Sequence, residues 1–170
     1  LIAEGDVVIN NTHFDTTRAH VVNNGGIPVD CPIDGAMDPD RPGDFKGNLD
    51  VEAARELAAE EGEDSIPVVV LTITNNSAAG QPVSMENIEA VSELAADIDA
   101  TFVIDACRFA ENAYFIQQRE SGYGDRPVAD IAREQLSHAD ATVMSGKKDA
   151  IANIGGFVGV RDEDLFERAK

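Results

Sequence analysis

Short runs of apolar residues rich in Val and Ile recur along the chain, and polar residues do not alternate with apolar ones within them. Strands that read this way are buried on both faces, as in parallel sheets covered by helices. The predicted strands are residues 7–10, 66–74, 101–107, 141–145 and 156–160. This pattern favours a layered α/β structure.

Helix-period spacing fills most of the segments between these runs. Segment 84–97 starts at Ser84, a preferred N-cap residue, and places Ile88, Val91 and Leu94 on one face. Similar patterns predict helices over residues 50–61, 109–118 and 126–136, and residues 162–170 read as an unfinished helix. The fold class predicted is α/β, a mostly parallel sheet flanked by helices, with ligands bound past the carboxyl ends of the strands.

Acidic residues dominate the charge of the chain, with 32 Asp and Glu against 13 Lys and Arg and a net charge of −19 at pH 7. This balance argues against nucleic acid and anionic membrane as partners. The acids are scattered through amphipathic segments, which predicts a solvated surface rather than a disordered tail. Such a surface in a chain with only four lysines is typical of a halophilic protein. An ordinary acidic protein is the alternative.

Length and cysteine usage indicate one domain in a reducing compartment. The two cysteines, Cys31 and Cys107, lack the paired spacing of a disulfide framework or a zinc site. No stretch approaches the roughly 20 apolar residues of a membrane span, and the start lacks signal-peptide features, so a cytoplasmic protein is expected. Residues 34–48 read as a surface loop. Both ends look cut, because the chain starts inside an apolar segment and stops inside a helical pattern.

Two adjacent lysines, Lys147 and Lys148, follow the predicted strand 141–145. A lysine that forms an imine needs partial desolvation and a cationic neighbour, and in this pair each lysine supplies the neighbour of the other. The alternative is a solvated turn.

An acid, Asp105, closes the run of β-formers that starts at residue 101. A carboxylate at this edge can keep a pyridine nitrogen protonated, which makes the ring of pyridoxal phosphate an electron sink. It can also cap the helix predicted from Phe109, and the two roles are compatible.

Two more stretches follow predicted strands. Residues 74–82 are small and polar, which allows close backbone approach to a ligand, although an ordinary turn has the same composition. Phe14 is either a platform on which a ligand ring stacks or a core residue.

Five stretches together resemble the β-eliminating lyase family, which includes tryptophanase and tyrosine phenol-lyase. They are FDTT at 14–17, DFKGNLD at 44–50, TNNSAAGQPVSMENI at 74–88, DACRFAENAYFIQQRE at 105–120 and MSGKKDAIANIGGF at 144–157. The likeness extends in order and spacing over nearly the whole chain. It implies that residues 1–170 are the central part of the large domain of a fold-type-I pyridoxal-phosphate enzyme, without its N-terminal segment and C-terminal small domain. A piece of this kind is expected to be inactive alone.

The resemblance also implies roles for individual residues. Lys148 matches the lysine that bonds the cofactor and later moves the α-proton of the substrate, and Asp105 matches the acid behind the pyridine nitrogen. The other matches are Arg108 and Asn76 near the phenolic oxygen of the cofactor, Phe14 stacked on its ring, Ser145 at its phosphate, and Asn153 at a potassium site with Lys147 close by. Ala79 departs from the glycine that is common in the family, and Cys107 from a small residue.

Asp15 resembles the acid that tryptophanases carry after the aromatic residue, where tyrosine phenol-lyases generally have threonine. The resemblance therefore implies β-elimination of L-tryptophan to indole, pyruvate and ammonia, with Lys148 and Asp15 as catalytic residues. Tyrosine phenol-lyase and other fold-type-I amino-acid enzymes are alternatives, and a non-catalytic binding or assembly piece is an alternative of another class. A homo-oligomer, a dimer of dimers, is expected from the family.

Overall fold

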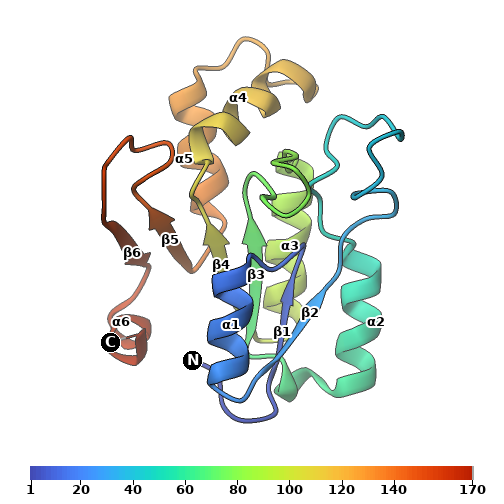
Figure 1. The fold of residues 1–170 in the computed structure, drawn as a ribbon, viewed down its shortest axis with the longest axis vertical. Coiled ribbons are helices and arrows are strands. Elements are labelled where there is room, and N and C mark those ends of the chain that lie inside the picture. Colours follow the sequence, from blue (N-terminus) through green and yellow to red (C-terminus); the bar gives the residue numbers. More distant parts are fainter. Residues whose placement is uncertain (170) are drawn as a thin grey trace.

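The computed structural model describes residues 1–169 and contains a six-stranded sheet between two layers of helices (Figure 1). The strands are β1 (Val7–Asn10), β2 (Ile27–Asp30), β3 (Val68–Thr72), β4 (Thr101–Asp105), β5 (Ala141–Ser145) and β6 (Gly156–Val160). Their order is β2-β1-β3-β4-β5-β6; β1 to β5 are parallel, and β6 runs antiparallel to β5. The predicted mostly parallel sheet is confirmed.

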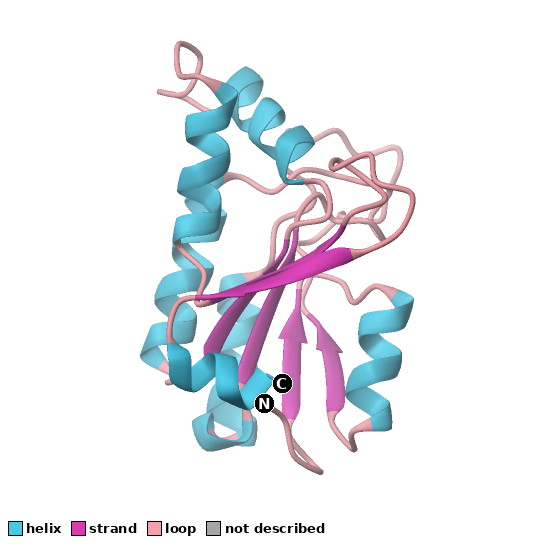
Figure 2. Cartoon of the chain, turned by 90° about the vertical axis from the view of Figure 1, so that its left-hand side faces the viewer, coloured by secondary structure: helices cyan, strands magenta, loops and turns pink. Residues whose placement is uncertain are grey.

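Helices connect the parallel strands β1 to β5, and Figure 2 shows the helices beside the sheet in a side view. They are α1 (Asp15–Asn23), α2 (Val51–Glu61), α3 (Met85–Asp97), α4 (Phe109–Arg119), α5 (Val128–Ser137) and α6 (Glu163–Ala169), with one 3₁₀ turn, η1 (Glu63–Ser65). Asp50 and Ser84 cap α2 and α3, each accepting a hydrogen bond from a first-turn N–H. Helices α2 to α6 match the sequence predictions, except that Lys170 lies outside the described residues. None of the helices within residues 1–169 has the length and apolarity needed to cross a membrane.

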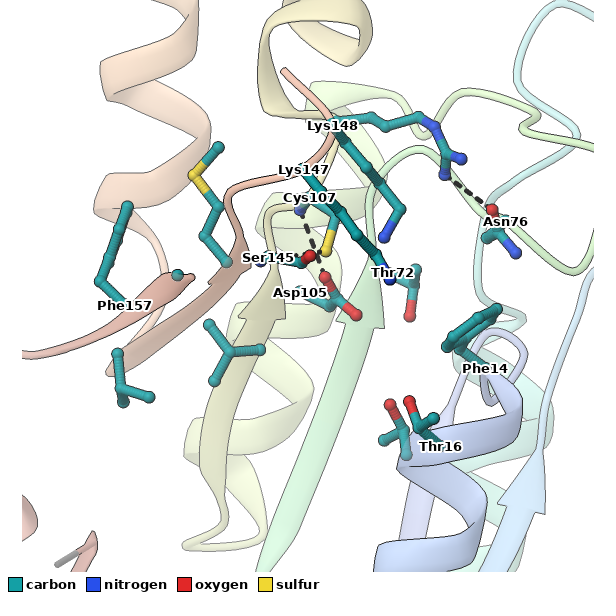
Figure 3. A pocket seen from close by; sticks show the side chains of 16 residues that line it. Phe14, Thr16, Thr72, Asn76, Asp105, Cys107, Ser145, Lys147, Lys148 and Phe157 are labelled. Atoms are coloured by element: carbon teal, nitrogen blue, oxygen red, sulfur yellow. Dashed lines mark hydrogen bonds between the residues drawn. The ribbon is translucent and has the colours of Figure 1, made fainter. Parts of the chain in front are cut away.

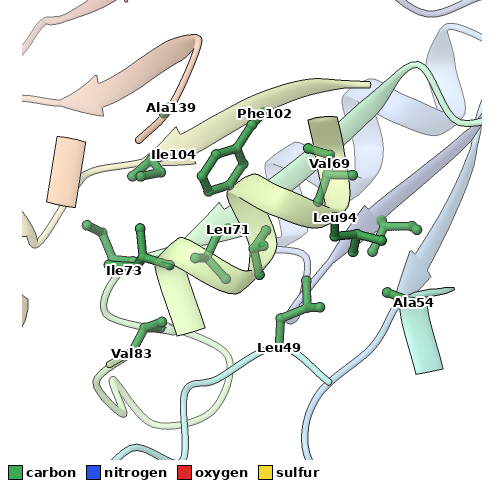
Figure 4. Packing of buried hydrophobic residues seen from close by; sticks show 14 of the residues in the cluster. Leu49, Ala54, Val69, Leu71, Ile73, Val83, Leu94, Phe102, Ile104 and Ala139 are labelled. Carbon is green, nitrogen blue, oxygen red and sulfur yellow. The ribbon is translucent and has the colours of Figure 1, made fainter. Parts of the chain in front are cut away.

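Both faces of the sheet are buried, as the unalternated runs predict. On one face Leu71 and Ile104 pack with Leu94 of α3 in a cluster that also takes residues from α2, α4 and α5 (Figure 4). On the other face strand residues form a smaller cluster with Val21 of α1 and Leu165 of α6. Successive residues of a strand point to opposite faces, so each strand contributes to both clusters.

Two elements, α1 and β2, were missing from the sequence predictions. Helix α1 buries only Val21 and has no apolar stripe, so its period is not readable. Strand β2 contains Pro28 and is half-buried, because it is an edge strand with one neighbour.

Two predicted strands, 66–74 and 101–107, were too long. The pairing of β3 with β4 stops at the partners Thr72 and Asp105, and the backbone leaves the sheet after each of them. The carboxyl ends of these strands therefore lie side by side.

Loop 34–48 is fastened to the sheet by a buried amide. The side chain of Asn11 donates to the carbonyls of Gly47 (2.7 Å) and Thr72 (3.0 Å), and its Oδ1 accepts from the Thr72 N–H (3.0 Å). Gly47 lies so close to the next loop that a Cβ there would be 2.2 Å from the carbonyl oxygen of Gln81. The loop is thus part of the domain and not a linker.

Asp30, at the end of β2, holds the start of α1. Its Oδ1 accepts from the backbone N–H of His13 (2.8 Å) and lies 2.6 Å from the imidazole Nδ1, and its Oδ2 pairs with Arg18. The imidazole is fully buried, and its Nε2 has no hydrogen-bond partner among residues 1–169. Burial lowers the pKa of His13 below its ordinary value of 6.5, although Asp30 acts in the opposite direction.

Replacing His13 with Phe should remove an acid-sensitive part of the stability. Because the fold favours the neutral imidazole, the unfolded chain binds more protons as pH falls below about 6.5, and the native state loses stability. We expect the stability advantage of the wild type over H13F to shrink as pH decreases from about 7.5 to about 5.5. Urea unfolding of both proteins at the two pH values measures this. An advantage that is constant or grows toward acid pH would contradict it.

Candidate active site

A pocket of about 580 Å³ opens at the carboxyl ends of β3, β4 and β5 (Figure 3). Its lining comprises Phe14, Thr16, Thr17, Thr72, Asn76, Asp105, Cys107, Arg108, Val143, Met144, Ser145, Lys147, Lys148, Gly156, Phe157 and Val158. The six residues predicted to hold a cofactor, from four separate segments of the chain, are all among them. The pocket lies where ligands bind in parallel α/β sheets.

Asp105 lies at the bottom of this pocket, at the end of β4. Its Oδ1 accepts a hydrogen bond from the Cys107 N–H (3.2 Å), and the carboxylate points into the pocket (Figure 3). The alternative that Asp105 caps the following helix is wrong, because the first N–H groups of α4 donate to Asp149 instead. The Asp105 carboxylate is therefore available to a ligand.

The two lysines lie on a turn between β5 and β6. Within it the Gly146 N–H donates to the Gly155 carbonyl (2.8 Å), and the Ile151 N–H donates to the Lys148 carbonyl (2.8 Å). Lys148 is half-buried and Lys147 is exposed, and both side chains extend into the pocket (Figure 3). Because Lys148 is partly desolvated, the structure does not favour the solvated-turn alternative for it.

Phe14 faces the lysines from the start of α1. The Lys148 Nζ lies 5.8 Å from the centroid of the Phe14 ring, within the range of a cation–π contact. Phe14 is half-buried and belongs to neither core cluster of residues 1–169, so the core alternative is not supported. Its ring instead lines the pocket.

Arg108 and Asn76 form another wall. The guanidinium Nη1 donates to the Asn76 Oδ1 (2.8 Å), which links the loops that follow β3 and β4. In the first of these loops Ala79 adopts a φ of 57°, in the left-handed region that favours glycine. Ala79 is thus tolerated in a glycine-like conformation.

Cys107 also lines the pocket, next to Asp105 and Ser145. Its Sγ accepts from the Ser145 N–H (3.4 Å). Burial, followed by a hydrogen bond with Asp105, raises the pKa of the Cys107 thiol. A protonated thiol is a weak nucleophile, so this residue shapes the pocket rather than reacting in it.

Two predicted site residues do not line the pocket. Asp15 is exposed in the first turn of α1, and Asn153 is exposed in the turn before β6. Conversely, sequence analysis did not single out several lining residues. They are Thr16, Thr17, Thr72, Val143, Met144, Gly156, Phe157 and Val158. The two threonines belong to the FDTT stretch, and Met144, Gly156 and Phe157 to the stretch 144–157, but neither stretch showed which of its residues reach the pocket. The residues of β6 do so through antiparallel pairing with β5.

Comparison with known sequences identifies tryptophanases and a tyrosine phenol-lyase as relatives of this chain. The profile of the family described as Beta-eliminating lyase matches residues 2–170. A probable tryptophanase of Halobacterium salinarum is 66% identical over 163 residues, which cover 96% of this chain and 36% of the relative. The tryptophanase of Salinibacter ruber is 49% identical, over 100% of this chain and 36% of its own. The tyrosine phenol-lyase of Clostridium tetani is 48% identical, over 99% and 37%. The chain thus spans little more than a third of the length of these relatives.

Solved structures with little sequence identity share the fold. A PLP-bound C-S lyase from Staphylococcus hominis has a TM-score of 0.64 at 15% identity, over 98% of this chain and 38% of its own. Oryza sativa TDC with PLP and tryptamine has a TM-score of 0.64 at 15% identity, over 97% and 31%. These likenesses confirm the expected fold class, that of the large domain of fold-type-I enzymes. From the profile match and the identities together, the chain belongs to the β-eliminating lyase family.

Proposed function

We propose that residues 1–170 are the central part of the cofactor-binding large domain of a pyridoxal-phosphate-dependent carbon–carbon lyase. The observation that carries this proposal is the convergence of Lys148, Asp105 and Phe14 on one pocket. Family membership and the short span of the chain relative to its relatives support it. In this proposal the N-terminal segment and the C-terminal small domain complete the enzyme, and the 170 residues alone do not turn over substrate efficiently.

The pocket suits pyridoxal phosphate. Its volume of about 580 Å³ is within the usual range of small-molecule sites. Lys148 offers an amine to the aldehyde, Asp105 a carboxylate to the pyridine nitrogen, and Phe14 a ring face for stacking. Arg108 and Asn76 offer polar groups to the phenolic oxygen, and Ser145 offers a hydroxyl to the phosphate.

When bound, pyridoxal phosphate supplies an electron sink for the electron pair left at the α-carbon of an amino acid. Asp105 stabilises the proton on the pyridine nitrogen through its negative charge. Lys148 would hold the cofactor through its amine, and the free amine would serve as the general base for the α-proton of the substrate. Phe14 excludes water from one ring face, and Arg108 donates hydrogen bonds at the side wall.

The proposed substrate is L-tryptophan, which is cleaved to indole, pyruvate and ammonia. The relative with 66% identity bears the name of a probable tryptophanase, and Asp15 is the residue in this chain that favours the indole leaving group. L-Tyrosine is the alternative, since a tyrosine phenol-lyase is 48% identical. Asp15 is exposed in the first turn of α1 and does not line the pocket, so segments outside this chain would have to bring the leaving group to it.

Further features of the proposed enzyme follow from the family. We propose a potassium ion near Asn153, assembly as a dimer of dimers, and a cytoplasmic location. The exposed apolar residues Ile151 and Ile154 beside Asn153 are consistent with a surface that another segment or subunit covers.

Reduction with borohydride in the presence of pyridoxal phosphate should label Lys148. The partly buried amine beside Phe14 is the one placed to bond the aldehyde. Peptide mass mapping locates the label, and Lys147→Ala serves as the matched control that should retain it while Lys148→Ala loses it. Labelling that persists at Lys147 in K148A would move the assignment, and no labelling of a folded wild type would overturn the proposed cofactor site.

Replacing Asp15 with Thr should lower indole release from L-tryptophan. If the carboxylate assists proton transfer at the leaving group, its loss reduces kcat by about a hundredfold. Indole is measured with the full-length enzyme, and labelling of Lys148 in the same variant controls for cofactor binding. Unchanged indole release would exclude a role for Asp15.

The proposed enzyme works at high salt, in keeping with its charge of −19 and its relatives in Halobacterium and Salinibacter. Helix α2 alone exposes Glu52, Glu56, Glu60 and Glu61. At about 1 M salt the Debye length falls to about 3 Å, which screens the repulsion between such acids. We expect the Tm to rise with KCl, and to rise less steeply in the double variant Glu56→Gln, Glu60→Gln. A Tm that does not depend on KCl would refute the proposal.

A further inference from the structure

Asp149, the residue after Lys148, is bonded to a distant helix. Its Oδ2 accepts hydrogen bonds from the N–H groups of Ala110 (2.6 Å) and Glu111 (3.3 Å), in the first turn of α4. Its own N–H donates to the carbonyl of Cys107 (3.4 Å). The lysine turn is therefore fastened to the segment that follows Asp105.

Helix α4 depends on this carboxylate because it lacks a cap of its own. Its N-cap residue, Arg108, makes no side-chain capping hydrogen bond, whereas Asp50 and Ser84 cap α2 and α3 locally. The first N–H groups of a helix are unpaired and carry partial positive charge, so an anionic acceptor there is stabilised. In α4 that acceptor comes from 39 residues further along the chain.

The hydrogen bonds between Asp149 and α4 also limit the positions that the lysine turn can adopt. Lys147 and Lys148 are adjacent, and both side chains reach the pocket (Figure 3). In this structure the amine that lies over the Phe14 ring is that of Lys148. With Asp149 bonded to α4, Lys148 is held at 5.8 Å from the Phe14 ring. Arg108, which bonds Asn76, lies at the start of α4. The Asp149 carboxylate therefore links the lysine turn to the side of the pocket that Arg108 and Asn76 form.

We propose that Asp149 is a positioning residue that selects Lys148 over Lys147 as the amine that bonds the cofactor. This inference rests on the proposed function, because it presupposes that pyridoxal phosphate reacts with a lysine in this pocket. Asp149 acts through the turn and does not itself contact the reacting atoms.

The test compares the sites of borohydride labelling in Asp149 variants. In Asp149→Ala the ratio of label at Lys148 to label at Lys147 should fall by about tenfold, the factor that corresponds to losing one helix-capping contact. Asp149→Asn keeps an acceptor oxygen and should retain most of the wild-type ratio. If D149A does not fold, Asp149→Glu, whose carboxylate is displaced by one methylene, should give an intermediate ratio.

The matched control is Asp50→Ala, which removes a carboxylate cap from α2 far from the lysines. It should lower stability without changing the labelling ratio, because a merely structural effect reduces labelling at both lysines together. A wild-type ratio in D149A, or an equal change in D50A, would overturn the inference and leave the proposed function standing. Absence of label in the folded wild type would instead overturn the proposed function.

Discussion

The parallel pairing of β3 with β4 and of β4 with β5 determines where the side chains of the candidate site lie. Parallel strands end at the same edge of a sheet, so the loops that follow them converge there. Asp105 ends β4, and Lys148 follows β5. The loop after β3 adds Asn76, and the start of α1 after β1 adds Phe14. Residues that are far apart in sequence thus surround one pocket, without any local contact having to bring them together.

Hydrogen bonds from a few polar side chains fix the loops around the pocket relative to the sheet and the helices. Asn11 fixes loop 34–48 against β3, Asp30 fixes the start of α1, and Asp149 fixes the lysine turn against α4. Asn11 and Asp149 in this way also satisfy backbone groups at the end of β3 and in the first turn of α4. The loops are therefore held by groups that also complete secondary structure.

The pocket and the rest of the surface differ in charge. The molecule has a net charge of −19, yet Arg108, Lys147 and Lys148 all line one pocket. These three cationic side chains share the pocket with one carboxylate, that of Asp105, so the pocket attracts anionic groups locally although the chain as a whole is acidic. A phosphate and a substrate carboxylate, both of which the proposed reaction involves, are such groups.

The layers of the fold, most of the helices and six of the residues that line the candidate site were predictable from the sequence. Unalternated runs specify strands buried on both faces, and Asp50 and Ser84 specify helix starts, because these are local properties of the chain. Strand β2 was not predictable in this way, since an edge position is defined by neighbours. That Asp149 rather than Asp105 caps α4, and that β6 turns back to bring Phe157 to the pocket, was decided only by tertiary structure. Such contacts join residues whose separation in sequence carries no periodic signal, so only the packed fold determines them.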